Sequence, residues 1–324
     1  MKGEDIASYK VIEHGDFAYN PARINVGSIA RYDGDMQCMI SSLYVCFKAN
    51  SEIVDSELLL HILKSPKMVY NYGINGEGGV RIYLFYPNFS RIRLSLPGLQ
   101  EQQKLASFFE LIEERIAIQN KIIEDLKKLK VGICEKLYGR DYPTVMLGKV
   151  ITQISERNRT SSISRVLSVS NIHGFVDQKE QFEDRAIASE DISNYKIVRH
   201  NDFAYNPARI NVGSIARLSS YSEGIISPMY ISFRCSPAIE PSYLESFLET
   251  TMFSTEVNKR LEGSVRMCLS FEGFCNIPIP FPDIPTQNSI GLQVATLNDK
   301  IDLESKVHGY LILQKNHLLA KMLI

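Results

Sequence analysis

DFAYNPARINVGSIAR, residues 16–31, recurs letter for letter at residues 202–217, an offset of 186. The match continues at the same offset, because CMISSLYVCFK (38–48) aligns with GIISPMYISFR (224–234). One residue is then absent from the second copy, so that GGVRI (78–82) aligns with GSVRM (263–267) at an offset of 185. The chain therefore contains two copies of one unit. A unit of about 185 residues is too long for a solenoid repeat and has the size of a domain with an appendage.

The two copies differ at their beginnings. Met1 aligns with residue 187, so about 46 residues that open the second copy have no counterpart in the first. The opening segment contains the strand-like run RVLSVSNI (165–172). Two explanations are open: the natural start lies upstream, or the first domain is truncated.

Composition places the chain among globular proteins. It has 324 residues, 44% of them hydrophobic, and a net charge of −1, which suits two or three domains with buried cores. No apolar run reaches the roughly 18 residues of a spanning helix, and the N-terminal residues lack a signal sequence. We therefore expect a cytoplasmic protein with no membrane partner. The six cysteines form no CxxC pair and are expected to be reduced, mostly buried thiols.

Each copy has the pattern of a mixed α/β domain. Residues 165–172 and 229–235 are β-branched and aromatic runs typical of strands, whereas residues 243–261 have apolar residues at helical spacing. The four prolines of residues 275–285 exclude a central strand and favour an extended connector.

A long helix with a heptad seam follows each connector. At 1.5 Å per residue, a helix over residues 100–138 would be about 58 Å long. Apolar residues alternate at steps of four and three, and polar residues interrupt both seams at equivalent places. The first seam contains Leu105, Phe109, Ile112, Ile116, Gln119, Ile123, Leu126, Lys130, Ile133 and Leu137, and the second contains Ile290, Val294, Leu297, Ile301, Glu304, His308, Leu311, Lys315, Leu318 and Met322.

These seams predict an antiparallel coiled coil that holds two similar domains a fixed distance apart. The shared polar positions could fix the register between the helices. The alternative is two separate amphipathic helices, each lying on its own domain.

Such a pair suits duplex DNA, whose half-sites are related by twofold axes. Local charge agrees with this interpretation: residues 157–176 contain three arginines and no acid, and Arg81, Arg91 and Arg93 lie in an acid-free stretch. Ordinary solvated charge is the alternative.

The identical block offers side chains that suit nucleic acid. Arginine can contact guanine or phosphate, and asparagine can pair with adenine. A framework turn that caps its own backbone is an equally good interpretation. The candidates are Asn20, Arg23 and Asn25 in the first copy, and Asn206, Arg209 and Asn211 in the second.

No catalytic or cofactor motif accompanies them. The block lacks the two residues that would complete the Asn-Pro-Pro-aromatic motif of adenine methyltransferases, and neither GxGxxG nor GxxxxGK[ST] occurs. The histidines show no metal-ligand spacing.

The order of domain, proline-containing connector, glutamine and long helix resembles the specificity subunit of type I restriction-modification systems. The phrases LPGLQEQQKLASFFELIEERIAIQNKIIEDLKKLK, IPIPFPDIPTQNSIGLQVATLNDKIDLESKV, NDFAYNPARINVGSIA and RLEGSVRMCLSFEGFCNIPIPFP carry the likeness. It implies two target-recognition domains, each reading half of a bipartite site in double-stranded DNA, and a helix pair that sets the gap.

The resemblance also implies partners. Two modification (methyltransferase) subunits dock on such a chain, and restriction and motor subunits complete the complex. The subunit itself is not an enzyme and binds no cofactor, because S-adenosylmethionine, ATP and Mg²⁺ belong to the partners. The alternatives are an assembly scaffold that does not read DNA and a store of recombining sequence. The missing opening segment puts independent reading by the first domain in doubt.

The expected boundaries follow from the repeat. Residues 1–97 form the first, incomplete target-recognition domain and 98–140 the first spacer helix; residues 141–283 form the second domain and 284–324 the second helix. The predicted DNA contacts are Arg165, Asn171, His173, Asn206, Arg209, Asn211 and Arg266 in the second domain, and Asn20, Arg23, Asn25 and Arg81 in the first.

Overall fold

The computed structural model describes residues 6–79, 81–171, 173–178, 191–263 and 267–322. It divides into two units. Unit 1 comprises Met1–Ile123 and Leu303–Ile324, and unit 2 comprises Glu124–Asp302. Among the described helices, none combines the length and the apolar character that crossing a membrane requires.

Unit 2 contains two four-stranded sheets. The first has the order β12-β11-β14-β7 with antiparallel pairs, and the second has the order β10-β13-β8-β9, in which only the β13–β8 pair is parallel. A two-stranded ladder joins β15 to β6. The strands are β6 (Thr144–Met146), β7 (Ile151–Ile154), β8 (Val166–Ser170), β9 (Gly174–Asp177), β10 (Lys196–Arg199), β11 (Phe203–Tyr205), β12 (Ile215–Arg217), β13 (Glu223–Ile226), β14 (Ile231–Cys235) and β15 (Pro278–Pro280).

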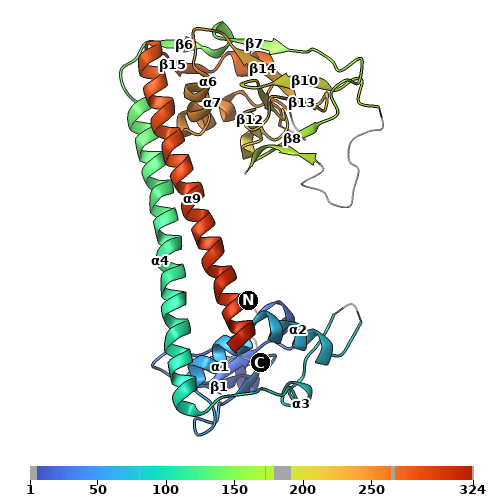
Figure 1. Ribbon diagram of the computed structural model, residues 1–324, viewed down its shortest axis with the longest axis vertical. Helices are drawn as coiled ribbons and strands as arrows, with labels where there is room; N and C mark the ends of the chain where they lie inside the picture. Colours follow the sequence, from blue (N-terminus) through green and yellow to red (C-terminus); the bar gives the residue numbers. More distant parts are fainter. Residues whose placement is uncertain (1–5, 80, 172, 179–190, 264–266, 323–324) are drawn as a thin grey trace. The chain divides into compact units, whose positions relative to one another are not determined.

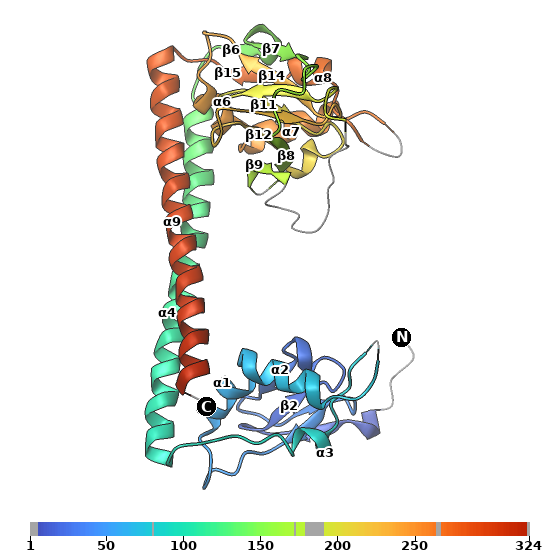
Figure 2. The same ribbon diagram turned by 45° about the vertical axis from the view of Figure 1, so that its right-hand side comes forward.

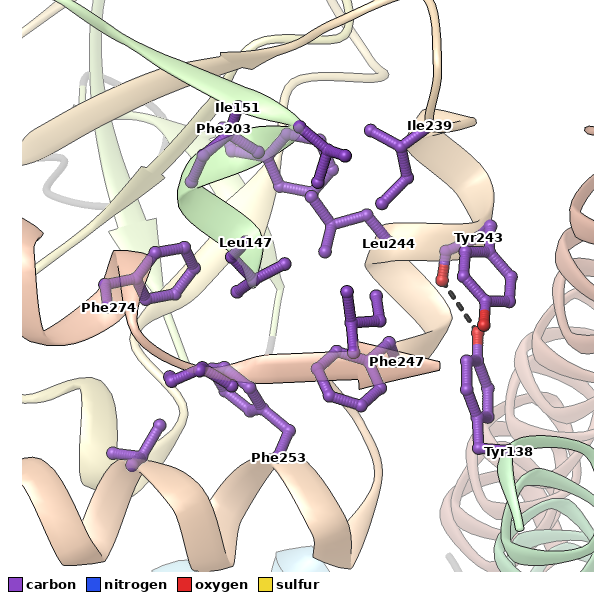
Figure 3. Packing of buried hydrophobic residues seen from close by; sticks show 14 of the residues in the cluster. Tyr138, Leu147, Ile151, Phe203, Ile239, Tyr243, Leu244, Phe247, Phe253 and Phe274 are labelled. Atoms are coloured by element: carbon purple, nitrogen blue, oxygen red, sulfur yellow. Dashed lines mark hydrogen bonds between the residues drawn. The ribbon is translucent and has the colours of Figure 1, made fainter. Parts of the chain in front are cut away.

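The core of unit 2 is rich in aromatic side chains. Phe233 stacks on Phe203 with ring centroids 5.2 Å apart, and Phe274 lies 5.0 Å from Phe233. The helices α6 (Pro241–Phe247), α7 (Thr251–Arg260) and α8 (Phe271–Cys275) contribute to this core. Figure 3 shows Phe247, Phe253 and Phe274 pointing inward together.

The single helix predicted over residues 243–261 is in fact two helices. α6 ends at Phe247 and α7 begins at Thr251. The hydroxyl of Thr250 accepts the backbone N–H of Phe253 and so caps a new helix. The apolar spacing continues through this break, so it could not reveal the cap.

Unit 1 repeats the elements of unit 2 from β10 to α8, at offsets of 186 and 185. Its sheets have the orders β3-β2-β5 and β1-β4. The register of β1 on β4 equals that of β10 on β13, since Lys10 pairs with Ile40 and Lys196 pairs with Ile226. The elements are β1 (Lys10–Ile12), β2 (Phe17–Tyr19), β3 (Ile29–Arg31), β4 (Cys38–Ile40), β5 (Val45–Phe47), α1 (Ser56–Leu63), α2 (Pro66–Asn75) and α3 (Tyr86–Phe89).

The identical block adopts the same backbone in both units. It forms a short 3₁₀ turn, η2 (Ile24–Val26) in unit 1 and η4 (Ile210–Val212) in unit 2. A glycine in the left-handed region closes each turn: Gly27 at φ 90° and Gly213 at φ 88°. Only glycine adopts this conformation without steric cost, which explains its place in both copies.

The long helices α4 (Leu99–Tyr138) and α9 (Ile284–Met322) lie side by side (Figure 1). Every described side chain of the predicted seams is buried or half-buried; that of Met322 lies outside the description. In unit 1 the amide of Gln119 donates to the carboxylate of Glu304 at 2.5 Å, and Lys315 pairs with Glu113. The two helices therefore run in opposite directions in this unit.

Unit 2 contains the equivalent contact. The ammonium of Lys130 donates to the side-chain oxygen of Asn298 at 2.9 Å. At an offset of 185, Lys130 and Asn298 correspond to Lys315 and Glu113. Hence α4 and α9 touch each other in both units, through the polar seam positions.

A buried glutamine joins each long helix to its domain. Gln287 is fully buried; its side-chain oxygen accepts the N–H of Glu240 at 2.9 Å, and its amide donates to the carbonyl of Pro282 at 2.9 Å. Gln102 makes the equivalent bonds, accepting the N–H of Asp55 and donating to the carbonyl of Pro97, both at 2.9 Å. The equivalence of these residues in the alignment thus has a structural cause.

His61 makes the stability of unit 1 sensitive to acid. Its side chain is buried beside Phe109, and burial lowers the pKa of His61. The unfolded chain therefore binds the proton more readily, so the free energy of unfolding should fall as pH drops below about 6.5. Urea denaturation at pH 7.5 and 5.5 should show a smaller loss for His61→Gln than for the natural chain. The exposed His317→Gln is the control; equal losses in all three proteins would contradict this role.

Candidate nucleic-acid interface

The identical turn of unit 2 packs against the β8–β9 hairpin. The hydroxyl of Ser214, just after η4, donates to the carbonyl of Val169 in β8 at 3.1 Å. Asn171 and His173 lie in the tight turn between β8 and β9 and are exposed. Figure 2 shows β8 and β9 beside β12, the strand that follows η4. The fold thus brings together two segments that are about 40 residues apart in sequence.

A hollow of about 510 Å³ opens between these segments. Arg209, Asn171 and Gln178 line it together with two tyrosines, Tyr195 and Tyr230. Its remaining polar lining comes from the hydroxyl side chains of Ser168, Ser170, Ser214 and Ser227, and no carboxylate is among its described lining residues. Such a surface suits an anionic, hydrogen-bonding ligand.

Arg209 provides the cation of this hollow. The residue is exposed, and within the described part of the chain no carboxylate lies within ion-pair distance of its guanidinium. Asn211 is also exposed on the same turn. Both side chains are therefore available to a ligand.

Asn206 has a framework role. Its side chain is buried, and its oxygen accepts the backbone N–H of Ala208 at 3.1 Å. Asn20 does the same for Ala22 at 3.0 Å. The framework interpretation of the turn therefore applies to these two asparagines, which hold the loop that presents the arginine.

A second hollow, of about 410 Å³, lies on the other face of the hairpin turn. His173 and Arg217 line it, but so do Glu245 and Glu249. The guanidinium of Arg217 donates to the carboxylate of Glu245 at 2.6 Å. This hollow is less suited to a polyanion than the first one.

Arg165 lies at the opposite end of β8 from Asn171. Six residues of extended strand separate the two by about 20 Å. The guanidinium of Arg165 stands 4.4 Å from the ring centre of Tyr221, and lies 3.6 Å from the carboxylate of Asp177. The structure therefore does not group Arg165 with the other predicted contacts.

Two arginines of unit 2 are neutralised in the fold. The guanidinium of Arg199 pairs with Glu156 at 2.6 Å and thereby lowers the pKa of that carboxyl group. Arg234 pairs with the buried Asp202 at 2.6 Å. Both arginines lie outside the acid-free stretches named in the sequence, and their charge is not available to a polyanion.

The aromatic part of the hollow was missed in the sequence. Tyr195 and Tyr230 have equivalents at the offset of 186, which are Tyr9 and Tyr44. This shared pair was the signal that could have revealed them. Tyrosines of this kind can stack on bases.

Unit 1 contains equivalents of the turn and of the two tyrosines that line the hollow of unit 2. Arg23 is exposed and Asn25 half-buried on η2, and Tyr9 and Tyr44 occupy the places of the hollow's tyrosines. Arg81 is exposed, next to the bridge between Glu77 and Tyr83, and is not part of this turn. The predicted contact Arg266 lies outside the described residues.

Comparisons with known proteins show what this chain is similar to. Residues 9–128 match the family described as the type I restriction modification DNA specificity domain. Two proteins of Methanocaldococcus jannaschii are similar. The MjaX specificity subunit is 27% identical over 43% of this chain and 33% of its own length; the MjaVIII specificity subunit is 22% identical over 83% and 69%, respectively.

A solved structure has the same fold. The S subunit of a type I restriction-modification system from M. genitalium matches with a TM-score of 0.59 and 14% identity over 98% of this chain and 84% of its own. Together with the specificity domain, these relatives confirm the resemblance seen in the sequence. Residues 9–128 thus match the type I specificity domain, and most of the chain is similar to type I specificity subunits.

Proposed function

We propose that this chain reads a bipartite site in double-stranded DNA through the turns η2 and η4. The observation that carries the proposal is the hollow of unit 2, which Arg209 and Asn171 line together and in which the described lining residues include no carboxylate. The same turn, with the same backbone and an equivalent Arg23, occurs in unit 1. Two similar surfaces in one chain support a site with two parts.

The chemistry of the hollow supports both affinity and specificity. The Arg209 guanidinium can neutralise a phosphate or form a fork on guanine, whereas the Asn171 amide can pair with adenine. Serine hydroxyls can donate to phosphate oxygens. Asn211, which is exposed on η4, and His173, which lines the second hollow, are the next candidates.

In this proposal the α4–α9 pair acts as a spacer and as a platform for partners. Contacts between the helices at polar seam positions in both units support one continuous antiparallel coiled coil. Two modification subunits would dock on the chain, with restriction and motor subunits completing a cytoplasmic complex. S-adenosylmethionine, ATP and Mg²⁺ would be bound by those partners.

Arg209→Ala tests the interface directly. We expect DNA affinity to fall by about 1–3 kcal/mol, because the variant loses the unpaired cation of the hollow. Competition gel shifts on the target duplex and on mixed-sequence duplex would measure the loss. A loss on the target alone identifies base reading, and an equal loss on both identifies a phosphate contact.

The matched control is Lys259→Ala, since Lys259 is exposed on α7 and already paired with Glu256 at 2.6 Å. It should leave affinity unchanged. Equal affinities of Arg209→Ala and the natural chain would refute the interface. Failure of the natural chain and of its complex with the modification subunits to shift DNA would favour the scaffold alternative.

Methylation of the host genome tests the two-part site. A host that carries this chain with its modification subunit should show methylated adenines in two short motifs separated by a constant gap. Because η2 and η4 are identical but their surroundings differ, the two motifs should be related without being the same. One contiguous motif would contradict the spacer.

A further inference from the structure

A hairpin of unit 1 extends between α2 and α3 (Figure 1). The backbone groups of Glu77 and Tyr83 close it through two hydrogen bonds of 2.8 Å. The N–H of Leu84 donates to the carbonyl of Pro21 at 3.0 Å, which attaches the hairpin to the identical block. The hairpin therefore lies beside the turn that presents Arg23 and that we propose to read DNA.

Two aromatic rings and one arginine share the outer face of this hairpin. Exposure alternates along residues 81–85, as it does in an extended strand. The exposed residues are Arg81, Tyr83 and Phe85, and the residues between them are half-buried or buried. The rings of Tyr83 and Phe85 are stacked, with centroids 6.0 Å apart and an interplanar angle of 10°. We call these two rings the aromatic shelf.

The place of the shelf is open in both units. Ser270, the equivalent of Phe85, is exposed in unit 2, where the opening segment of the copy is present. Cys268, the equivalent of Tyr83, is half-buried there. The exposure of the place is thus a property of both copies, but only unit 1 carries aromatic rings at it.

The sequence around the shelf is basic. Between residues 58 and 100 the only acid is Glu77, whose carboxylate accepts the side-chain amide of Asn88 at 2.7 Å. Within the described residues, no carboxylate lies within ion-pair distance of the Arg81 guanidinium. The charge favours a polyanion as the ligand. The cations of this stretch are Lys64, Lys67, Arg81, Arg91 and Arg93.

We infer that the aromatic shelf binds the face of an unstacked base in DNA, while Arg81 contacts a neighbouring phosphate. Exposed aromatic rings beside basic residues stack on bases, and every base offers a flat face to them. A base inside an intact duplex has no free face, so the ligand must be a base that has left the stack. The shelf is therefore a second kind of DNA contact, distinct from the arginine of the turn.

The proposed function supplies such a base. Enzymes that modify a base take it out of the duplex, which leaves the opposite base without its partner. The inference rests on the proposed function in this respect. It adds a contact that the two units do not share, because unit 2 has a cysteine and a serine in place of the rings.

The test compares two duplexes of the same mixed sequence, one of which carries a single bulged thymine. The full chain should bind the bulged duplex about tenfold more tightly in fluorescence anisotropy, because a bulged base is already free to stack on the shelf. Tyr83→Cys combined with Phe85→Ser introduces the residues of unit 2 and should remove this preference. Both side chains are exposed, and the bonds between Tyr83 and Glu77 come from the backbone, so the double variant should fold.

Tyr310→Ser is the matched control, because Tyr310 is an exposed tyrosine on α9, outside the hairpin. It should keep the preference for the bulged duplex. Equal binding of both duplexes by the natural chain would overturn the inference and leave the proposed reading of DNA in place, whereas binding of neither duplex would overturn both. A preference that survives in the double variant, or that is lost in Tyr310→Ser, would also overturn the inference.

Discussion

Gln287→Ala should lower the free energy of unfolding of unit 2 by about 3 kcal/mol, because it leaves buried backbone groups without partners. The amide of Gln287 is fully buried and joins the start of α9 to the loop before α6 and to the connector. In the alanine variant the N–H of Glu240 and the carbonyl of Pro282 lose their bonds.

Hydrogen exchange and urea denaturation would measure this loss. Asn288→Ala, next to Gln287 but exposed, should change stability by less than about 0.5 kcal/mol. Gln102→Ala should produce the same loss in unit 1, since Gln102 makes the same bonds there. If Gln287→Ala changed the free energy of unfolding as little as Asn288→Ala, the hydrogen bonds of Gln287 would not stabilise the attachment of α9 to its domain.

Removing one heptad from each long helix should shorten the gap in the DNA site by about three base pairs. The expectation rests on the proposed spacer: seven residues of helix span about 10.5 Å, and base pairs are 3.4 Å apart. Deleting residues 120–126 and 305–311 preserves the steps of four and three in both seams. The two motifs themselves should not change, because both turns remain intact.

Genome methylation in a host with the modification subunit would measure the gap. Deleting five residues from each helix is the control, because it rotates the seam away from its partner and should abolish methylation. A site with an unchanged gap after the heptad deletion would refute the spacer while leaving the DNA-reading turns untested by this experiment.

The regular parts of the fold could be predicted from local patterns. The heptad steps identified the long helices and their buried seams, and the identical block indicated that both units share one architecture. The break at Thr250 could not be predicted, because the apolar period passes through it and one hydroxyl cap decides it. The β15–β6 ladder was also hidden, since its three residues contain two prolines.

The candidate interface was only partly visible in the sequence. Arg209 could be found because it lies in the identical block. The burial of Asn206 and the pairing of Arg199 with Glu156 depend on tertiary contacts that no local pattern records. Arg165 and Asn171 were both predicted to contact DNA, but they lie at opposite ends of β8 and are separated by its length.

The polar pair between Gln119 and Glu304 makes the halves of this duplicated protein non-interchangeable. Were two identical second helices to associate, two carboxylates would face each other at that level of the seam, whereas the mixed pair joins an amide donor to a carboxylate acceptor. The mixed pair of Gln119 and Glu304 is thus favoured over the association of two second helices.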